Sequence, residues 1–232
     1  MQVLAARRGL YVGLSVLVTV IAFVGFWPTY FGPLVSGTVE KLPVIHVHAA
    51  VYVGWLAIFI AQAAFASARR MDLHIRLGNF AIGYGVLVIV IGVTVAVSMF
   101  AVRVREGNLA DAQARLAAPL SDMVLFAPLF AAAISLRRKP EVHKRLMIVA
   151  TTLLLVAAVG RMTFIGAPWL LLLVWCSPIL LGAAYDVVRR HTVPWIYLGG
   201  VILVLARRFG TPLVRDSSVW HDWTAWLATA VS

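Results

Sequence analysis

The fold of this chain is decided by a short cationic joint between two long apolar segments, Arg69-Arg70-Met71-Asp72-Leu73-His74-Ile75-Arg76-Leu77. A second joint of the same kind follows later and reads Arg138-Lys139-Pro140-Glu141-Val142-His143-Lys144-Arg145-Leu146. In both joints an acid, an apolar residue, a histidine, any residue, an arginine and a leucine occur in the same order. The recurrence predicts an internal repeat of two helix hairpins, with His74 and His143 in equivalent positions.

The composition indicates a membrane protein. Of the 232 residues, 62% are hydrophobic and 12% are charged, which is far from the composition of a soluble globular domain. The 20 Lys and Arg residues outnumber the 9 Asp and Glu residues, but they stand at the ends of apolar runs. They therefore indicate topology and contacts with the lipid bilayer, and no nucleic acid is expected as a partner. The single cysteine, Cys176, lies inside an apolar run, so no disulfide framework is expected.

Apolar runs close to the ~20 residues that cross a bilayer predict an all-α integral membrane bundle of about seven transmembrane helices. The chain is expected to form a single transmembrane domain, 1–232. The first run is interpreted as a span and not as a signal peptide, because no small-residue cleavage site follows it closely. The predicted spans are 10–27, 44–66, 77–102, 119–136, 146–165, 169–188 and 193–206.

Two further helices are expected outside these spans. Residues 108–117 suit a short surface helix, with Asn108 and Asp111 placed as a capping pair. Residues 218–230 place tryptophans at helical spacing and predict an amphipathic helix that rests at the outer membrane interface.

The basic residues also predict how the bundle is oriented. With the N-terminus inside, the inner ends of the spans carry more Lys and Arg than the outer ends. The positive-inside rule then places the N-terminus in the cytoplasm and the C-terminus in the periplasm of a bacterial inner (plasma) membrane. Both joints would face the cytoplasm, and the two hairpins would form a parallel repeat about an axis along the membrane normal.

The two joint histidines are candidates to bind one cofactor. If spans 77–102 and 146–165 adjoin the repeat axis, His74 and His143 could face each other and ligate haem b or a divalent metal. Arg76 and Arg145 would meet the haem propionates, and the ring would lie against the glycine face formed by Gly78, Gly85 and Gly92. That face equally suits close helix packing, and basic residues at a joint also suit lipid phosphates.

A stripe of polar and aromatic residues crosses span 44–66. It begins at His48 and continues through Tyr52, Trp55, Phe59 and Gln62. Residues two apart on a helix point in nearly opposite directions, so His46 and His48 cannot both face one interior site unless the helix begins after them, and His48 is favoured.

Asp122 and Arg161 are expected at the same outer depth as His48. A charge within the membrane is costly unless it is paired, so the two residues are predicted to form an ion pair, which would either support a site or staple the helix ends. On a continuous helix Arg161 would share one stripe with His143, ~27 Å away. His48 and Asp122, with either His46 or His221, also form a candidate metal site.

The pattern His46-Val47-His48-Ala49, with Trp55, Gln62 and the two joints, resembles a group of small, uncharacterised bacterial multi-pass membrane proteins. The resemblance covers roughly residues 44–161 and implies the architecture alone. A vaguer likeness is to membrane cytochromes of the cytochrome b561 kind, whose histidines on neighbouring helices ligate haem. It implies His74 and His143 as axial ligands, whereas a second histidine pair, as in two-haem members, is missing from span 119–136.

Three functions remain open at this stage. The first is an inner-membrane redox protein with one haem or metal, passing electrons between the quinone pool and another membrane subunit. The second is a metal-dependent hydrolase that acts on lipid through the outer residues. The third is a cofactor-free scaffold or transporter subunit. A Gly-rich phosphate loop, a His-Glu-x-x-His motif and a nucleophile beside a base are all missing from the sequence.

Overall fold

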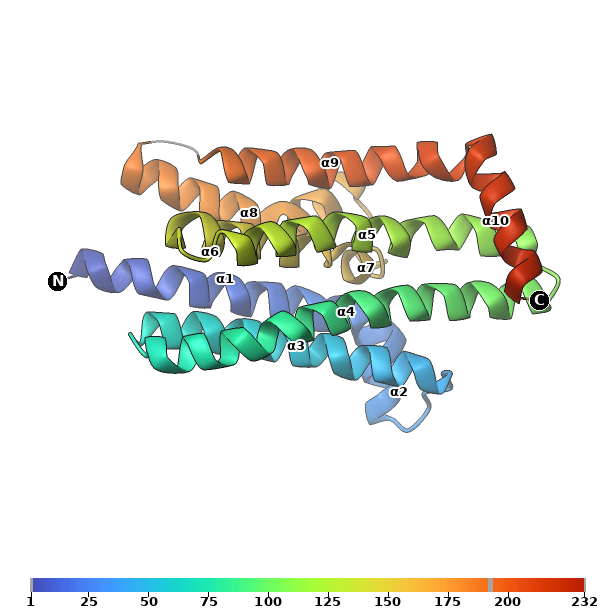
Figure 1. Cartoon of the computed structure of the whole chain (residues 1–232), viewed down its shortest axis with the longest axis horizontal. Coiled ribbons are helices and arrows are strands. Elements are labelled where there is room, and N and C mark those ends of the chain that lie inside the picture. The colour runs from blue at the N-terminus through green and yellow to red at the C-terminus, as the bar shows by residue number, and fades with distance from the viewer. Residues whose placement is uncertain (1, 192–193, 232) are drawn as a thin grey trace.

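The computed structural model describes residues 2–191 and 194–231, and every regular element in them is a helix (Figure 1). Seven helical segments are long and apolar enough to cross a membrane, as a multi-pass protein requires. The elements are α1 (Gln2–Phe26), the π-helix η1 (Trp27–Phe31), α2 (Gly32–Val35), α3 (Pro43–Ser67), α4 (Met71–Arg105), α5 (Leu109–Ser135), α6 (Pro140–Leu153), α7 (Val156–Val159), α8 (Pro168–Arg190), α9 (Trp195–Arg215) and α10 (Ser218–Val231).

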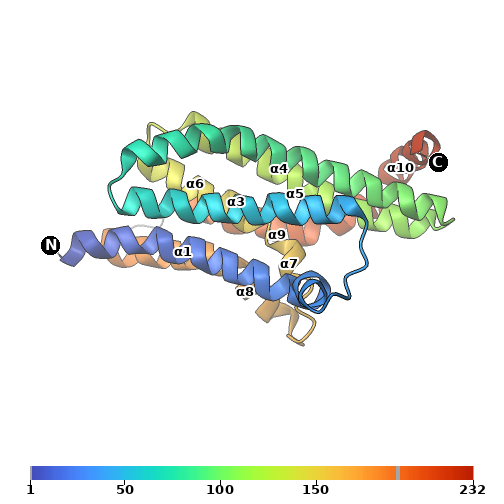
Figure 2. The same ribbon diagram turned by 90° about the horizontal axis from the view of Figure 1, so that it is seen from below.

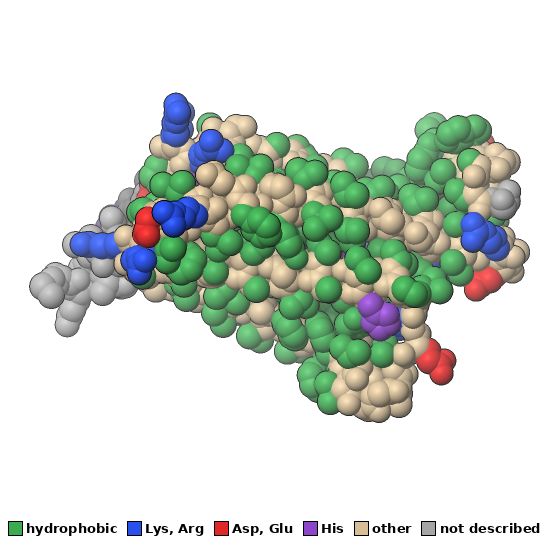
Figure 3. Space-filling view, turned by 60° about the horizontal axis from the view of Figure 1, so that its bottom comes forward, with side chains coloured by type: hydrophobic (Ala, Val, Ile, Leu, Met, Phe, Trp, Pro, Cys, Tyr) green, Lys and Arg blue, Asp and Glu red, His purple; other side chains and the backbone are tan. Residues whose placement is uncertain are grey.

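The bundle has two distinct ends. The joint end holds the start of α1 and the α3–α4 and α5–α6 turns, and the far end holds the α4–α5 turn and α10 (Figure 1). Basic side chains gather at the joint end, while hydrophobic side chains cover much of the surface between the ends (Figure 3). This distribution is typical of a bundle whose sides contact lipid tails and whose ends contact headgroups and water.

The α3–α4 and α5–α6 hairpins lie side by side because α4 packs against α5. Two glycines of α4 allow the close approach: a Cβ at Gly85 would overlap the Phe130 ring, and one at Gly92 would overlap Met123 and the Tyr52 hydroxyl. Close helix packing is thus the role of these two positions. The internal repeat itself stays a prediction.

The fifth span is not the continuous helix expected over 146–165. The Thr152 carbonyl accepts hydrogen bonds from the Leu155 backbone N–H, at 3.0 Å, and from the Trp175 indole N–H, at 2.9 Å. A side chain inserted at a helix carbonyl is a recognised cause of a break, and α6 ends there before the single turn of α7. The stripe that was predicted to join His143 to Arg161 is therefore interrupted.

This broken span is shielded from lipid by its neighbours. Buried residues make up 61% of its most apolar segment, against 33% or less in the other six spans. Gly25 of α1 packs directly against the Ala158 carbonyl, and there is no space for a side chain at this position. Irregular backbone at membrane depth is tolerated where protein covers it, as it is here.

The fourth and seventh spans are longer than predicted. Residues 109–117 form no separate surface helix, since α5 runs without interruption from Leu109 to Ser135. The predicted cap is confirmed, because the Asn108 side chain accepts a hydrogen bond from the Asp111 N–H at 3.3 Å. Helix α9 continues through two arginines, where the predicted span stops, and ends at Arg215.

The C-terminal helix α10 crosses the far ends of α4 and α5 (Figures 1 and 2). Trp220 donates its indole N–H to the Gln113 carbonyl at 3.0 Å, and the Gln113 amide donates to the His221 carbonyl at 3.1 Å. Trp223 and Trp226 stay exposed, 40% and 65%, on the other side of the helix. One side of α10 is thus fixed to the bundle and the other is free to contact an interface.

Candidate functional site

The histidine pair, His74 and His143, lies at the joint end, and both residues use the same hydrogen-bonding pattern. His74 Nδ1 is 3.2 Å from the Gln62 carbonyl of α3, and His143 Nδ1 is 2.8 Å from the Ala133 carbonyl of α5. A carbonyl can only accept, so each Nδ1 must carry the proton. In the neutral imidazoles, the Nε2 lone pairs are then left for another partner.

The α3–α4 and α5–α6 hairpins, which lie side by side, place both imidazoles at the joint end. Each side chain is partly buried. The turns that lead to them differ in detail, because Arg69 before α4 has φ 61°, a left-handed conformation that no residue of the α5–α6 turn adopts. The repeated sequence nevertheless gives both histidines one orientation, tied to the end of the preceding helix.

An orphaned amide lies beside the histidine pair. Both polar atoms of the Gln62 side chain are buried and have no hydrogen-bond partner among the described residues. The amide faces Gly78, 3.4 Å from where a Cβ would stand. A buried amide without hydrogen-bond partners costs free energy. A water molecule or a bound group beside the Gln62 amide would remove this cost.

The two arginines predicted to meet a cofactor are not equivalent. Arg76 is exposed, whereas Arg145 is buried and pairs with Asp186 of α8 at 2.8 Å and with Glu141 at 2.9 Å. The role of Arg145 at haem propionates stays a prediction, and in this structure its guanidinium is held by two carboxylates.

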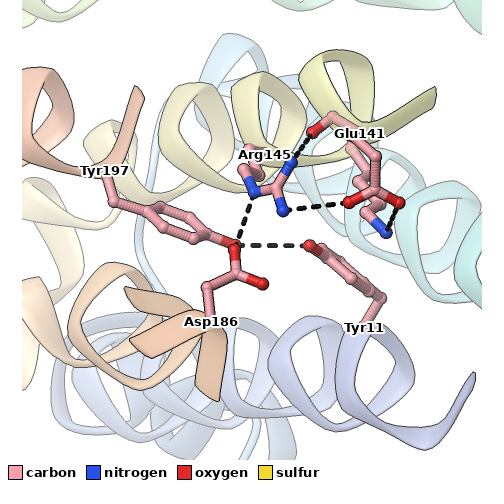
Figure 4. Close-up of polar contacts among 6 residues, drawn as sticks. Tyr11, Glu141, Arg145, Asp186 and Tyr197 are labelled. Atoms are coloured by element: carbon pink, nitrogen blue, oxygen red, sulfur yellow. Dashed lines mark hydrogen bonds and ion pairs between the residues drawn. The ribbon is translucent and has the colours of Figure 1, made fainter. Parts of the chain in front are cut away.

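Figure 4 shows how Arg145 is enclosed by four helices. Arg145 and Glu141 come from α6, Asp186 from α8, Tyr11 from α1 and Tyr197 from α9. The two tyrosine hydroxyls are 3.4 Å apart. This network ties α1 and the C-terminal helices to the second hairpin, and its position next to the joint could not be read from spacing along one helix.

The glycine face has little space for a flat cofactor. Phe130 fills the space at Gly85, and Met123 with Tyr52 fills the space at Gly92. Gly78 alone of the three meets nothing closer than the Gln62 amide. A ring bound by the histidine pair would be limited to the level of Gly78, at the joint end.

The predicted ion pair between Asp122 and Arg161 is wrong in its partner. Asp122 pairs with Arg207 of α9 at 2.5 Å, and Arg207 also donates to the Thr211 hydroxyl and to the Ala118 carbonyl. Arg161 instead donates to the Ala157 carbonyl and lies over the Phe26 ring, 4.8 Å from its centroid. The prediction failed because Arg207 was assigned to a loop, while α9 carries it alongside α5.

The outer histidines do not converge on one site. His46 is 3.0 Å from the Tyr30 hydroxyl, and His221 is 3.2 Å from the Gln113 side chain. His48 contacts Tyr52, with the two rings tilted by 32° and their centroids 4.1 Å apart. In residues 2–191 and 194–231, no three His, Cys, Asp or Glu side chains are grouped as metal ligands. The set of His46, His48 and Asp122 predicted for a metal therefore does not form within the described chain.

The stripe on α3 contains three polar side chains whose buried atoms have no partner in the described part of the chain. They are Nδ1 of His48, Nε1 of Trp55 and the amide of Gln62. The sequence indicated the stripe but not this property, since missing hydrogen bonds depend on neighbours from other helices. Gln62 is the member that lies beside the histidine pair.

Comparison of the chain with protein-family models, with curated proteins and with solved structures gave no match.

Proposed function

We propose that this protein is a membrane redox protein that binds one haem at the joint end through Nε2 of His74 and His143. The observation that carries the proposal is that both histidines commit Nδ1 to a backbone carbonyl. Ligating histidines almost always make such a second hydrogen bond, which fixes the tautomer and turns Nε2 toward the metal.

Haem is favoured over a bare metal ion because of the number of ligands. Two imidazoles complete the coordination of a haem iron, since the porphyrin supplies the other four donors. A bare ion would need further protein ligands. Among the described residues, no third His, Cys, Asp or Glu side chain lies with two others in a group that could hold a metal ion. The same count disfavours the lipid hydrolase.

The surrounding residues fit the group in part. The orphaned Gln62 amide offers a donor and an acceptor to the bound group or to its water, and exposed Arg76 is left for a carboxylate. A haem held there would exchange single electrons. The quinone pool and a second membrane subunit are the proposed electron partners.

The orientation proposed with this function is a cytoplasmic N-terminus in a bacterial inner membrane. Its support is the gathering of basic side chains at the joint end (Figure 3). A periplasm-dependent reporter fused after residue 232 should be active, and the same reporter fused before residue 1 should be inactive; the reverse pattern would contradict the orientation.

An absorption spectrum tests the haem. Protein purified from haem-replete cells should show a Soret band, and His74→Ala and His143→Ala should each remove it. His221→Ala is the control, because this histidine lies at the far end. A colourless wild-type protein that is monodisperse and helical would refute the haem and favour a scaffold or transporter subunit.

A further inference from the structure

A groove of about 580 Å³ runs between α1 and α8, two of the seven spans, which lie side by side (Figure 2). Helix α1 lines it with Gly13 and Leu17, and α8 lines it with Leu181, Tyr185 and Arg189. The groove is lined by no residue of the histidine pair or of the network around Arg145, but Leu10 and Tyr185 directly adjoin Tyr11 and Asp186 of that network (Figure 4).

The groove is apolar along its length, and the described chain does not fill it. A Cβ at Gly13 would meet no atom within 4 Å, and Leu181 is 51% exposed. From Leu10 to Leu17, the α1 side of the groove extends ~10 Å along the helix. Because both helices are spans, this surface faces the hydrocarbon of a bilayer.

One end of the groove is polar. The Tyr185 hydroxyl is buried and has no partner among the described residues. Arg189 lies over the Tyr185 ring, 6.0 Å from its centroid, is exposed, and forms no ion pair with a described residue. An exposed guanidinium without an acid among the described residues, at the end of an apolar groove, matches the phosphate of a lipid whose acyl chain lies in the groove.

We propose that this groove binds one anionic phospholipid, with an acyl chain between α1 and α8 and the phosphate on the exposed Arg189. The chain would cover the surface left open at Gly13. The negative charge would neutralise Arg189, which lacks an acid in the described structure. This proposal does not depend on the haem.

The test is a titration of the full-length protein in detergent with dioleoylphosphatidylglycerol, followed by native mass spectrometry. We expect one saturable site with at least tenfold preference over dioleoylphosphatidylcholine. Gly13→Leu fills the groove and should abolish the saturable site for both lipids. Arg189→Gln should keep the acyl-chain site and lose the preference for phosphatidylglycerol.

Matched variants separate the groove from general effects. Gly83→Leu places the same side chain at an equally open glycine of α4, and Arg208→Gln removes an arginine that lies over Phe209 on α9. Both should bind lipid as the wild type does. If Gly13→Leu does not fold, Leu181→Trp fills the groove from α8 and should have the same effect.

Three outcomes would overturn the proposal. One is saturable binding that survives in both Gly13→Leu and Leu181→Trp. Another is equal loss of preference in Arg208→Gln and Arg189→Gln. The third is competition by inorganic phosphate at lipid concentration, which would mean that the anion binds without the acyl chain.

Discussion

The bundle contains two buried arginine–carboxylate pairs, and they differ in how many acids each arginine has. Arg145 pairs with Asp186 and also with Glu141, whereas Arg207 has Asp122 as its acid within the described chain. The Arg145–Asp186 side chains are 5% and 3% exposed, and those of Arg207 and Asp122 are 8% and 11% exposed. Burial is thus similar, and redundancy is the main difference.

Both pairs join a helix of the α5–α6 hairpin to the C-terminal helices, α6 to α8 and α5 to α9. Both buried arginines are neutralised by an acid on a neighbouring helix, so these two ion pairs indicate assembly of the bundle and not chemistry. The histidine pair is different, because none of the described residues pairs with its Nε2 atoms. Free ligand atoms are a better sign of a site here than the presence of charges.

The largest effect is expected at the pair without redundancy. Asp122→Asn leaves the Arg207 charge buried and unpaired, which should cost ~3–5 kcal/mol of unfolding free energy in mixed micelles. In a double-mutant cycle, Asp122→Asn should couple strongly with Arg207→Leu and be additive with Arg161→Leu. Coupling to Arg161 in place of Arg207 would reverse the assignment.

A smaller effect is expected at Arg145, which keeps one acid when the other is removed. Asp186→Asn should cost ~2 kcal/mol, as for a hydrogen bond to a charged group. Glu141→Gln should cost less, because this side chain is 44% exposed. The double variant should cost more than the sum, since Arg145 then loses both acids; strict additivity in the same unfolding assay would argue against redundancy.

The smallest effect is expected at a surface pair, Arg215 with Asp216 at 2.7 Å. The hydrogen bond from Arg215 lowers the pKa of the Asp216 carboxyl, so any stabilisation is present above the usual aspartate pKa and lost as pH falls through the lowered value. Because the carboxyl is exposed, Asp216→Asn should leave the unfolding midpoint unchanged at neutral and at acidic pH. A clear shift would mean that exposed pairs matter as much as the two buried ones.

Hydropathy predicted the seven helical segments because a bilayer demands long apolar runs, whatever packs against them. It could not predict the break in the fifth span, since the Thr152 carbonyl is taken by Trp175, a contact between helices. The end of α9 was predicted too early for a similar reason. From the sequence, Arg207 is a charged residue typical of a loop, and only the neighbouring helix α5 provides the acid, Asp122, that pairs with it.

The candidate site also contains features that the sequence predicts and features that only the packing of helices determines. The repeated joints identified His74 and His143, because a shared motif is visible in the sequence itself. The ion pair between Arg145 and Asp186 depends on which helices become neighbours, and so does the lack of a described hydrogen-bond partner for the Gln62 amide. Helical periodicity shows which residues share a face but not what that face will meet.

The length of α4 sets how the molecule meets the thickness of its membrane. Its 35 residues make a rod ~52 Å long, against a hydrocarbon core of ~30 Å. Even a tilt of ~40° would leave ~40 Å along the membrane normal, so part of the rod stands outside the core. At its far end Arg103 pairs with Asp111 at the start of α5, and α10 lies across both helices. A thicker bilayer would cover more of α4 and a thinner one would expose more of it. The fraction of α4 outside the hydrocarbon core therefore depends on the thickness of the membrane.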